Sequence, residues 1–261
     1  MKITIITSNK SRHNYLINQL SSDANNLYVI QECDTLFPGE VIGNYPKSKV
    51  LKKYFDKVNK SQNKIFGKQF IKANNKMKIL SLKKGDLNKC DISFLKEFLS
   101  SDIYIVFGSS YIKGQLAKFL SKKKTYNIHM GISPYYRGTD CNFWALYDNN
   151  PHLVGATVHL LSSGLDNGPI LYHAMSNLKS NPYEYTMSCV KSAFHSLYER
   201  IKSGNIFKID SVPNIKEKQI RYSKKIDFND LILKKYFNKE VNLNSKSFDK
   251  ELLKDPYFFN N

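Results

Sequence analysis

The 261-residue chain lacks any uninterrupted apolar run of the ~18 residues that a membrane span requires. It also has few cysteines: Cys33, Cys90, Cys141 and Cys189. They are far apart and form no CxxC pair, which argues against a zinc site or a disulfide framework and indicates reduced thiols. No GxGxxG or P-loop fingerprint occurs, so a nicotinamide or ATP cofactor is unsupported. These absences predict a protein with no membrane partner and no bound metal.

The first residues, MKITIITSN, begin directly with an alternating strand pattern. They lack the charged, apolar and small-residue order of a secretory signal. Together with the widely spaced cysteines, this beginning predicts a cytoplasmic protein.

Acidic residues are scarce. There are 22 Asp and Glu against 40 Lys and Arg, giving a net charge of +18. Such a charge would suit a nucleic-acid-binding protein or an enzyme for phosphorylated substrates, but enrichment in Lys and Asn can also reflect compositional bias. The charge alone does not decide between these readings.

The most basic stretch spans residues 47–78, where eleven lysines face one acidic residue, Asp56. Four apolar residues fall at helical spacing within it: Leu51, Tyr54, Phe55 and Val58. The pattern predicts a lysine-coated helix, or two, packed on a sheet. A solvated face is favoured over a phosphate or polyanion site.

Short β-type runs alternate with helical patterns along the chain. Strands are predicted at 2–7, 27–31, 78–82 and 103–107, with helices around 15–20, 94–99 and 116–120. Pro182 begins a long helix that stops at Gly204, and His195 beside its apolar stripe is taken as structural. This order predicts a Rossmann-like α/β fold with a mixed, largely parallel sheet flanked by helices, in which 154–160 and 169–174 form a hairpin.

Chemistry-bearing residues gather between positions 125 and 174. Asn127 and His129 alternate with apolar residues in a predicted strand, so the amide and the imidazole share one face near its carboxyl end. Asp166 lies in a glycine-bracketed turn after the next strand. An amide donor, an imidazole and a carboxylate can together transfer an acyl group without a covalent enzyme intermediate. The same residue types also fit a structural histidine and an ordinary turn aspartate.

Three motifs occur here in a fixed order: Asn127-x-His129, Pro134-x-x-Arg137-Gly138 and Gly164-x-Asp166-x-Gly168. In this order they resemble the signature of the folate-dependent formyltransferases. The resemblance is strongest over 125–174 and extends across residues 1–205. It implies a catalytic domain over 1–205 and a short C-terminal extension over 206–261.

The resemblance implies transfer of a formyl group from N10-formyltetrahydrofolate to a primary amine, with no metal. His129 would take the amine proton, Asn127 and protonated His129 would stabilise the oxyanion, and Asp166 would orient the imidazole. The residues carried over to the cofactor pocket are Phe107, Gly108, Tyr111, Ile112 and Gly164. Those expected to bind the acceptor are Arg12 and His13, at the start of the first helix, with Tyr135 and Arg137.

The acceptor has to be chosen among similar enzymes. Methionyl-tRNA formyltransferases add a sizeable C-terminal RNA-binding domain, and formyltetrahydrofolate deformylases carry an extra domain before the first strand. Glycinamide ribonucleotide formyltransferases differ in the loop after Asn-x-His. The aromatic run 135–144 is most similar to that of sugar N-formyltransferases, which act on nucleotide-linked amino sugars such as dTDP-4-amino-4,6-dideoxyglucose for surface-polysaccharide synthesis.

Two alternatives stay open at this point. One is a glycinamide ribonucleotide formyltransferase, and the other is a non-enzymatic, basic nucleic-acid-binding protein on the same fold; the favoured reading has no nucleic-acid partner. The resemblance also implies a homodimer formed partly by C-terminal elements, including a predicted helix over 227–237. Its expected contacts are aromatic: Tyr222, Phe228, Tyr236 and Phe237.

Overall fold

The computed structural model describes residues 1–33, 48–162, 166–243 and 249–260. Gly164, which the resemblance assigns to the cofactor pocket, lies outside the described residues, so that assignment stays a prediction.

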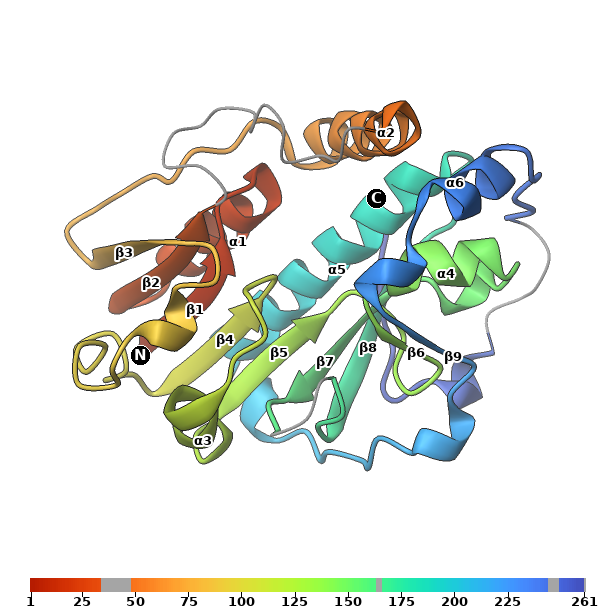
Figure 1. The fold of residues 1–261 in the computed structure, drawn as a ribbon. Helices are drawn as coiled ribbons and strands as arrows, with labels where there is room; N and C mark the ends of the chain where they lie inside the picture. Colours follow the sequence, from red (N-terminus) through yellow and green to blue (C-terminus); the bar gives the residue numbers. More distant parts are fainter. Residues whose placement is uncertain (34–47, 163–165, 244–248, 261) are drawn as a thin grey trace.

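Within the described part of the chain, one sheet has eight strands in the order β10-β8-β7-β5-β4-β1-β2-β3 (Figure 1). Strands β3, β2, β1, β4 and β5 run parallel, whereas β7 is antiparallel to both β5 and β8. The predicted mixed sheet and its hairpin are confirmed. The strands are β1 Lys2–Ser8, β2 Asn26–Cys33, β3 Met77–Lys83, β4 Ile103–Phe107, β5 Thr125–His129, β7 Ala156–Leu160, β8 Ile170–Ser176 and β10 Tyr257–Phe259.

Helices cover both faces of this sheet (Figure 1). Helices α1 (Ser11–Ser21) and α5 (Pro182–Lys202) pack over one face with Ile3 and Ile5, while α3 (Gly114–Ser121) packs over the other with Ile6 and Val106. Strands buried on both faces carry near-continuous apolar runs, as β4 does. Short 3-10 turns connect the elements at Leu87–Lys89, Pro151–Leu153, Asn205–Phe207, Lys216–Lys218, Lys225–Asp227 and Lys250–Leu252.

Local sequence signals explain the limits of α5. Asn181 caps the helix by accepting hydrogen bonds from two backbone N–H groups, and Pro182 occupies the first turn, where no intrahelical partner is needed. Gly204, just beyond the end, has a φ of 73°, which glycine adopts without strain. The predicted boundaries are confirmed. His195 is half-buried with its ring centroid 5.2 Å from that of Phe259, which fits a structural role.

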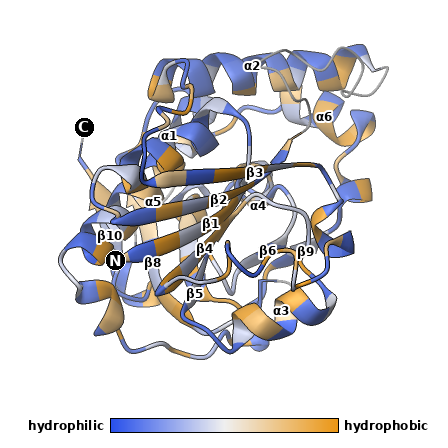
Figure 2. Cartoon of the chain, turned by 90° about the vertical axis from the view of Figure 1, so that its left-hand side faces the viewer, coloured by the Kyte–Doolittle hydropathy of each residue, from blue (hydrophilic) through white to orange (hydrophobic). Residues whose placement is uncertain are grey.

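The basic stretch forms a single helix, α2 (Lys49–Phe66), over its described part. It packs mainly against α5, α1 and α6 rather than on the sheet, so the expected packing was wrong. Figure 2 places α2 at the outer edge of the molecule with hydrophilic segments along it. Its lysines extend into solvent or form ion pairs with neighbouring elements, as Lys64 does with Glu184 of α5 at 2.8 Å.

One predicted helix is absent from the described structure. Residues 92–99 form consecutive turns in which Leu95 and Leu99 are buried against the sheet but Phe94 is exposed. The apolar pattern therefore identified buried positions correctly and their backbone geometry incorrectly. Among the described helices, none is long and apolar enough to cross a membrane.

A second apolar cluster joins α4 (Cys141–Tyr147) to the C-terminal segment, including α6 (Asp230–Phe237). Strands β6 (Tyr136–Gly138) and β9 (Arg221–Ser223) pair beside it. Tyr236 is only 5% exposed, and Phe228 packs edge-on against Phe143 at 4.8 Å. Tyr236 is therefore a core residue and Phe228 is partly buried against the same cluster, so neither is the exposed ring that was expected, while Tyr222 is exposed. The homodimer itself stays a prediction.

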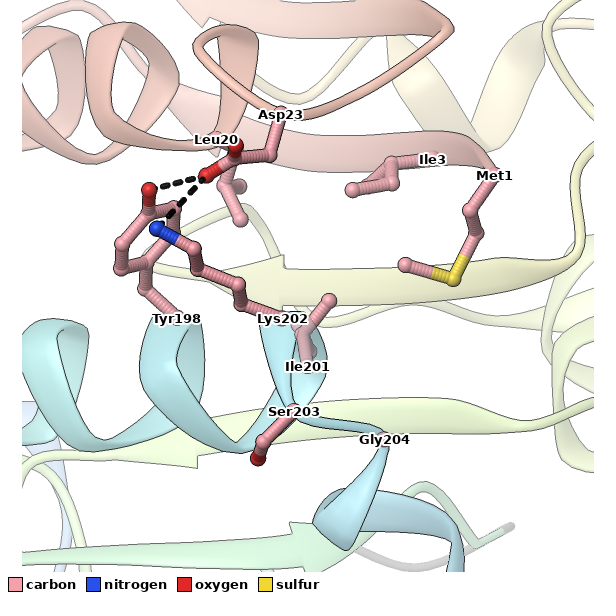
Figure 3. Close-up of a pocket in the computed structure, with 9 residues that line it drawn as sticks. All are labelled: Met1, Ile3, Leu20, Asp23, Tyr198, Ile201, Lys202, Ser203 and Gly204. Carbon is pink, nitrogen blue, oxygen red and sulfur yellow. Dashed lines mark hydrogen bonds and ion pairs between the residues drawn. The ribbon is translucent and has the colours of Figure 1, made fainter.

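A cavity of about 500 Å³ opens beside the amino end of β1, between the last turns of α1 and α5 (Figure 3). Its floor is apolar, with Met1, Ile3 and Leu20. The carboxylate of Asp23 at its rim is already bonded to the Tyr198 hydroxyl and lies 3.9 Å from the Lys202 ammonium. This cavity is at the end of the sheet away from His129 and brings together none of the residues predicted to react.

Candidate active site

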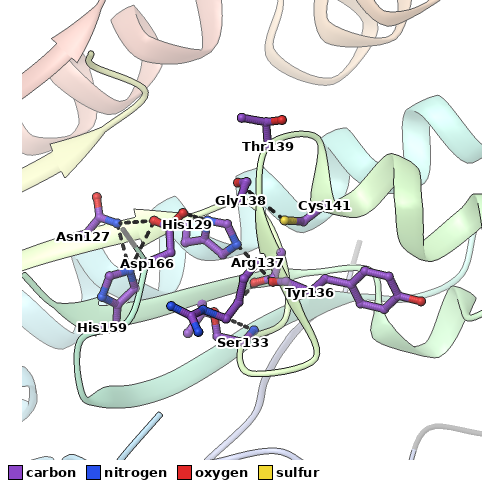
Figure 4. Close-up of polar contacts among 12 residues, drawn as sticks. Asn127, His129, Ser133, Tyr136, Arg137, Gly138, Thr139, Cys141, His159 and Asp166 are labelled. Atoms are coloured by element: carbon purple, nitrogen blue, oxygen red, sulfur yellow. Dashed lines mark hydrogen bonds and ion pairs between the residues drawn. The ribbon is translucent and has the colours of Figure 1, made fainter. Parts of the chain in front are cut away.

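The tertiary structure brings Asn127, His129 and Asp166 together (Figure 4). The first two project from the same face of β5. Asp166, which lies in the chain between β7 and β8, is also beside the imidazole. Asp166 Oδ2 lies 3.3 Å from His129 Nδ1, and Asp166 Oδ1 lies 3.4 Å from Asn127 Nδ2. Residues separated by 39 positions in sequence thus form one polar cluster.

Two glycines of the motifs, Gly168 and Gly138, occupy positions where a side chain would clash with the backbone. A Cβ added to Gly168 would lie 1.7 Å from the carbonyl oxygen of Leu160, so the loop that carries Asp166 can fold back onto β7 only with glycine there. Gly138 has a φ of 94°, and an added Cβ would lie 2.0 Å from the Ser223 carbonyl oxygen. Glycine at 138 therefore permits the pairing of β6 with β9.

The surroundings of His129 favour its protonated form. The residue is 7% exposed, and this burial alone would lower its pKa, but the Asp166 carboxylate and the nearby Cys141 thiol together raise the pKa of His129 well above 6.5. Its Nε2 lies 3.3 Å from the Tyr136 carbonyl, a second acceptor. Both ring nitrogens thus face acceptors, as an imidazolium requires.

Asp166 shows the complementary effect. Burial alone would raise its pKa, but the neighbouring His129 holds the pKa of this carboxyl well below its usual range. The residue adopts a φ of 46°, a left-handed conformation that aspartate tolerates better than most residues, and Asn214 donates a hydrogen bond to its backbone carbonyl at 2.9 Å. Asp166 is therefore a fixed anion beside the imidazole.

His159 belongs to the cluster, and sequence reasoning missed it. It lies opposite Asn127 in the antiparallel β5–β7 pair, with its Nε2 2.8 Å from Asn127 Nδ2. Because Asp166 can only accept, Nδ2 is the donor to both neighbours. His159 Nε2 is then the acceptor, and its Nδ1–H donates to the Leu160 carbonyl at 2.9 Å. The signal available was a histidine in a predicted strand just before the Asp166 turn.

Replacing His159 with alanine is expected to lower kcat about tenfold, because the amide of Asn127 would lose the bond that fixes its orientation. His159→Gln, which keeps a polar group in place, should recover part of the loss. Steady-state kinetics with folding checked by circular dichroism would measure both. Equal kcat in the wild type and His159→Ala would show that Asn127 is held without this histidine.

Cys141 also contacts this cluster. It is buried at the start of α4, and its Sγ lies 3.6 Å from the Gly138 carbonyl. A Cβ placed on Gly131 would lie within 3.2 Å of both Cys141 Sγ and His129 Nε2, so the thiol and the imidazole flank the same narrow space. No sequence pattern pointed to this cysteine.

The described residues that were predicted to hold the cofactor lie at the carboxyl end of β4 and in the loop that follows it. Phe107 and Ile112 are buried in the core, Gly108 turns the chain with a φ of 64°, and Tyr111 is 47% exposed. Of these side chains, only Tyr111 presents a substantial surface to a ligand. The others can act through their backbone groups, and their contacts with a cofactor stay a prediction.

The residues predicted to bind the acceptor divide into two groups. His13 is 2% exposed beneath Gly108, with its Nδ1 2.7 Å from Thr7 Oγ1, and burial with neighbouring Arg12 lowers its pKa well below 6.5. The Tyr135 hydroxyl donates to the Leu252 carbonyl at 3.2 Å. Both side chains are buried and hydrogen-bonded within the protein, and their contact with an acceptor stays a prediction.

The two arginines are less buried. Arg12 begins α1 next to the end of β1 and donates to the Gln62 side chain of α2. Arg137 Nη1 lies 3.5 Å from Gln219 Oε1. Their binding to an acceptor stays a prediction. Within the described ranges, no group of three or more His, Cys, Asp or Glu side chains could hold a metal ion.

Comparison with known proteins adds independent findings. No known family profile matches the chain. A curated relative, the methionyl-tRNA formyltransferase of Thermosynechococcus vestitus, is 34% identical over 73 residues, which is 28% of this chain but only 22% of the relative's length.

Solved formyltransferases share the fold over most of the chain. A sugar N-formyltransferase from a Shewanella species has a TM-score of 0.52 and 17% identity, covering 97% of this chain and 85% of its own. An N-formyltransferase from Helicobacter canadensis, in complex with folinic acid and dTDP-3-aminofucose, has a TM-score of 0.52 and 14% identity over 95% and 78%. Glycinamide ribonucleotide transformylase 1 from Symbiobacterium toebii has a TM-score of 0.51 and 15% identity over 85% and 93%. The chain therefore has the fold of the formyltransferases, as its three motifs indicated.

Proposed function

We propose that this protein transfers a formyl group from N10-formyltetrahydrofolate to a primary amine. The observation that carries the proposal is the cluster of a carboxylate, an imidazole and an amide at Asp166, His129 and Asn127, joined by contacts of 3.3 and 3.4 Å. Such groups, held in a buried setting before the substrate arrives, can stabilise an oxyanion and move a proton without rearranging.

The reaction would begin when the amine nitrogen attacks the formyl carbon and the carbonyl electrons move to oxygen. Asn127 Nδ2–H can turn to this oxyanion by giving up its long 3.4 Å contact with Asp166, while the 2.8 Å contact with His159 keeps the amide in place. The imidazolium of His129 supplies the second donor.

Collapse of the tetrahedral intermediate breaks the bond between the formyl carbon and N10. His129 gives its proton to the departing N10 and takes one from the former amine, so protons and charge balance over the turnover. Asp166 favours the imidazolium that exists before and after this exchange.

The acceptor we propose is a nucleotide-linked amino sugar of the dTDP-4-amino-4,6-dideoxyglucose type, used for surface polysaccharide. Support comes from the aromatic run 135–144 and from the fold shared with sugar N-formyltransferases. The net charge of +18 suits a diphosphate-linked substrate. Glycinamide ribonucleotide is the second candidate, because the same fold occurs in its transformylase.

The acceptor can be identified by incubating the protein with N10-formyltetrahydrofolate and a panel of dTDP- and UDP-linked amino sugars, with glycinamide ribonucleotide included. Mass spectrometry should show the gain of one formyl group on a nucleotide sugar. Formylation of glycinamide ribonucleotide alone would replace the sugar assignment with the second candidate. No product from any amine would contradict formyl transfer itself.

Arg12 is the residue through which the acceptor class can be tested. It follows the end of β1, two strands from β5 in the sheet, at the same edge as His129. A guanidinium at the start of a helix is suited to a diphosphate. We expect Arg12→Ala to weaken binding of the nucleotide sugar by about 1–3 kcal/mol, which would appear as a higher KM for the sugar. The folate KM should change little.

Lys122→Ala is the matched control for Arg12→Ala, since it removes one positive charge from the opposite edge of the sheet, just before β5. It should leave both KM values unchanged. If Arg12→Ala had the same KM for the nucleotide sugar as the wild type, the proposal that Arg12 binds the diphosphate would be wrong.

A further inference from the structure

Glu32, near the end of β2, is a buried carboxylate outside the cluster of Asn127, His129 and Asp166. It is 1% exposed. One of its carboxylate oxygens accepts the backbone N–H of Gly85 at 2.8 Å, and the other accepts that of Ser110 at 2.6 Å. Burying a carboxylate is costly unless such hydrogen bonds compensate it, and bonds to an ionised acceptor are stronger than neutral ones. Both backbone groups are therefore firmly tied to this side chain.

The two bonds join loops from opposite sides of β2. Gly85 follows β3, which neighbours β2 on one side, whereas Ser110 follows β4, which lies beyond β1 on the other. Glu32 therefore reaches across the end of β1. It braces the loop after β4 against a segment of chain at the edge of the sheet.

The segment that contains Gly85 also contacts the loop after β4 through a second residue, Asn88. Asn88, three residues after Gly85, donates from Nδ2 to the Tyr111 carbonyl at 2.9 Å and accepts the Lys113 N–H at 2.7 Å. Leu87 anchors this segment in the core between the sheet and α3. Residues 108–113 are thus fixed at three backbone positions: Ser110, Tyr111 and Lys113.

This loop is on the side of the sheet that carries the reacting groups. Asn127 pairs in register with Val106, whose side chain packs on the α3 side, and Glu32 shares that side because Ile30, two residues earlier, packs there too. The loop held by Glu32 and Asn88 therefore follows β4 directly beside Asn127 and His129.

We propose that Glu32 is a positioning residue that sets the backbone of residues 108–113 for binding the formyl donor. The inference rests on the proposed function and on the prediction that Gly108, Tyr111 and Ile112 of this loop belong to the folate pocket. Glu32 touches neither substrate; it acts through the Ser110 N–H directly and through the segment that carries Asn88. Its loss should therefore weaken donor binding and leave acceptor binding and chemistry in place.

The test compares Glu32→Gln, Asn88→Ala and the control Glu97→Gln. Glutamine keeps the size of the side chain but offers only one acceptor oxygen, so one of the two bonds is lost. Asn88 is exposed, so Asn88→Ala tests the second anchor with little risk to folding. Glu97 is an exposed carboxylate paired with Lys78, so its replacement removes the same charge without touching the loop.

Calorimetry with folinic acid, steady-state kinetics and hydrogen exchange of residues 108–113 would be measured for each protein. In Glu32→Gln, we expect the folinic acid Kd and the donor KM to rise about tenfold. Exchange in the loop should be faster, while kcat and the acceptor KM stay within about twofold. Asn88→Ala should show the same pattern more weakly, and Glu97→Gln should behave as the wild type.

The outcomes separate this inference from the proposed function. If the wild type binds folinic acid and Glu32→Gln binds it equally well, with only a lower Tm, the role of Glu32 is structural and the inference fails. A parallel rise of donor and acceptor KM would also overturn it. If the wild type neither binds folinic acid nor transfers a formyl group, the proposed function fails and the inference falls with it.

Discussion

Replacing His129 with asparagine is expected to reduce kcat for formyl transfer by about a thousandfold or more, with the Kd for folinic acid little changed. In the proposed reaction, the imidazole both supplies a charged donor to the oxyanion and exchanges protons with N10 and the amine, and proton transfer of this kind contributes about 10²–10⁴ in rate. Asparagine fills much of the volume but can do neither at neutral pH. His129→Ala should lose as much.

His195→Asn is the matched control for His129, because it replaces a half-buried histidine on α5 outside the polar cluster. It should leave kcat within about twofold of the wild type, since rates respond to the reacting groups rather than to histidine content. Single-turnover kinetics with a saturating donor would isolate the chemical step. Activity of His129→Asn within tenfold of the wild type would remove this residue from the mechanism.

Asp166→Asn is expected to lower kcat at neutral pH by about two to three orders of magnitude while the fold is retained. The carboxylate opposes the effect of burial on His129, so with an amide in its place burial dominates and the pKa of His129 falls. The imidazolium needed for the oxyanion is then scarce at pH 7. Asp210→Asn, at an exposed site, should have no such effect.

The pH profile distinguishes this role from a merely structural one. In the wild type, kcat should stay level through neutral pH and fall only as pH rises past the raised pKa of His129. In Asp166→Asn, that fall should move to lower pH. A profile that keeps its shape while only the amplitude drops would make Asp166 a turn residue.

The same pair links stability to pH. The raised pKa of His129 gives stability that is complete below its ordinary value of 6.5 and is lost as pH rises through the folded-state pKa. The lowered pKa of Asp166 gives stability that is complete above 3.8 and is lost as pH falls through its folded-state pKa. The wild type should therefore exceed Asp166→Asn in free energy of unfolding most clearly between these two values, as urea titrations at several pH values can test.

Local patterns predicted the strand and helix order well where steric rules act within a few residues. Pro182 and Gly204 set the limits of α5, and the alternation of Asn127 and His129 with apolar neighbours placed both on one face of β5. The same patterns mispredicted 92–99, because an apolar spacing of three to four also fits consecutive turns under a sheet. They also assigned Tyr236 to the surface, since nothing in its neighbourhood indicates that α2 and α4 cover it.

The sequence by itself identified the proposed reacting groups, Asn127, His129 and Asp166, because their residue types and the glycines around them follow from local requirements of acyl-transfer chemistry and of the chain's turns. Only the tertiary structure decided which groups support them. His159 meets Asn127 through the antiparallel register of β5 and β7, and Glu32 meets Ser110 across the end of β1. These contacts join residues from strands that are distant in sequence, and their geometry depends on strand order and register, which no local pattern of side chains specifies.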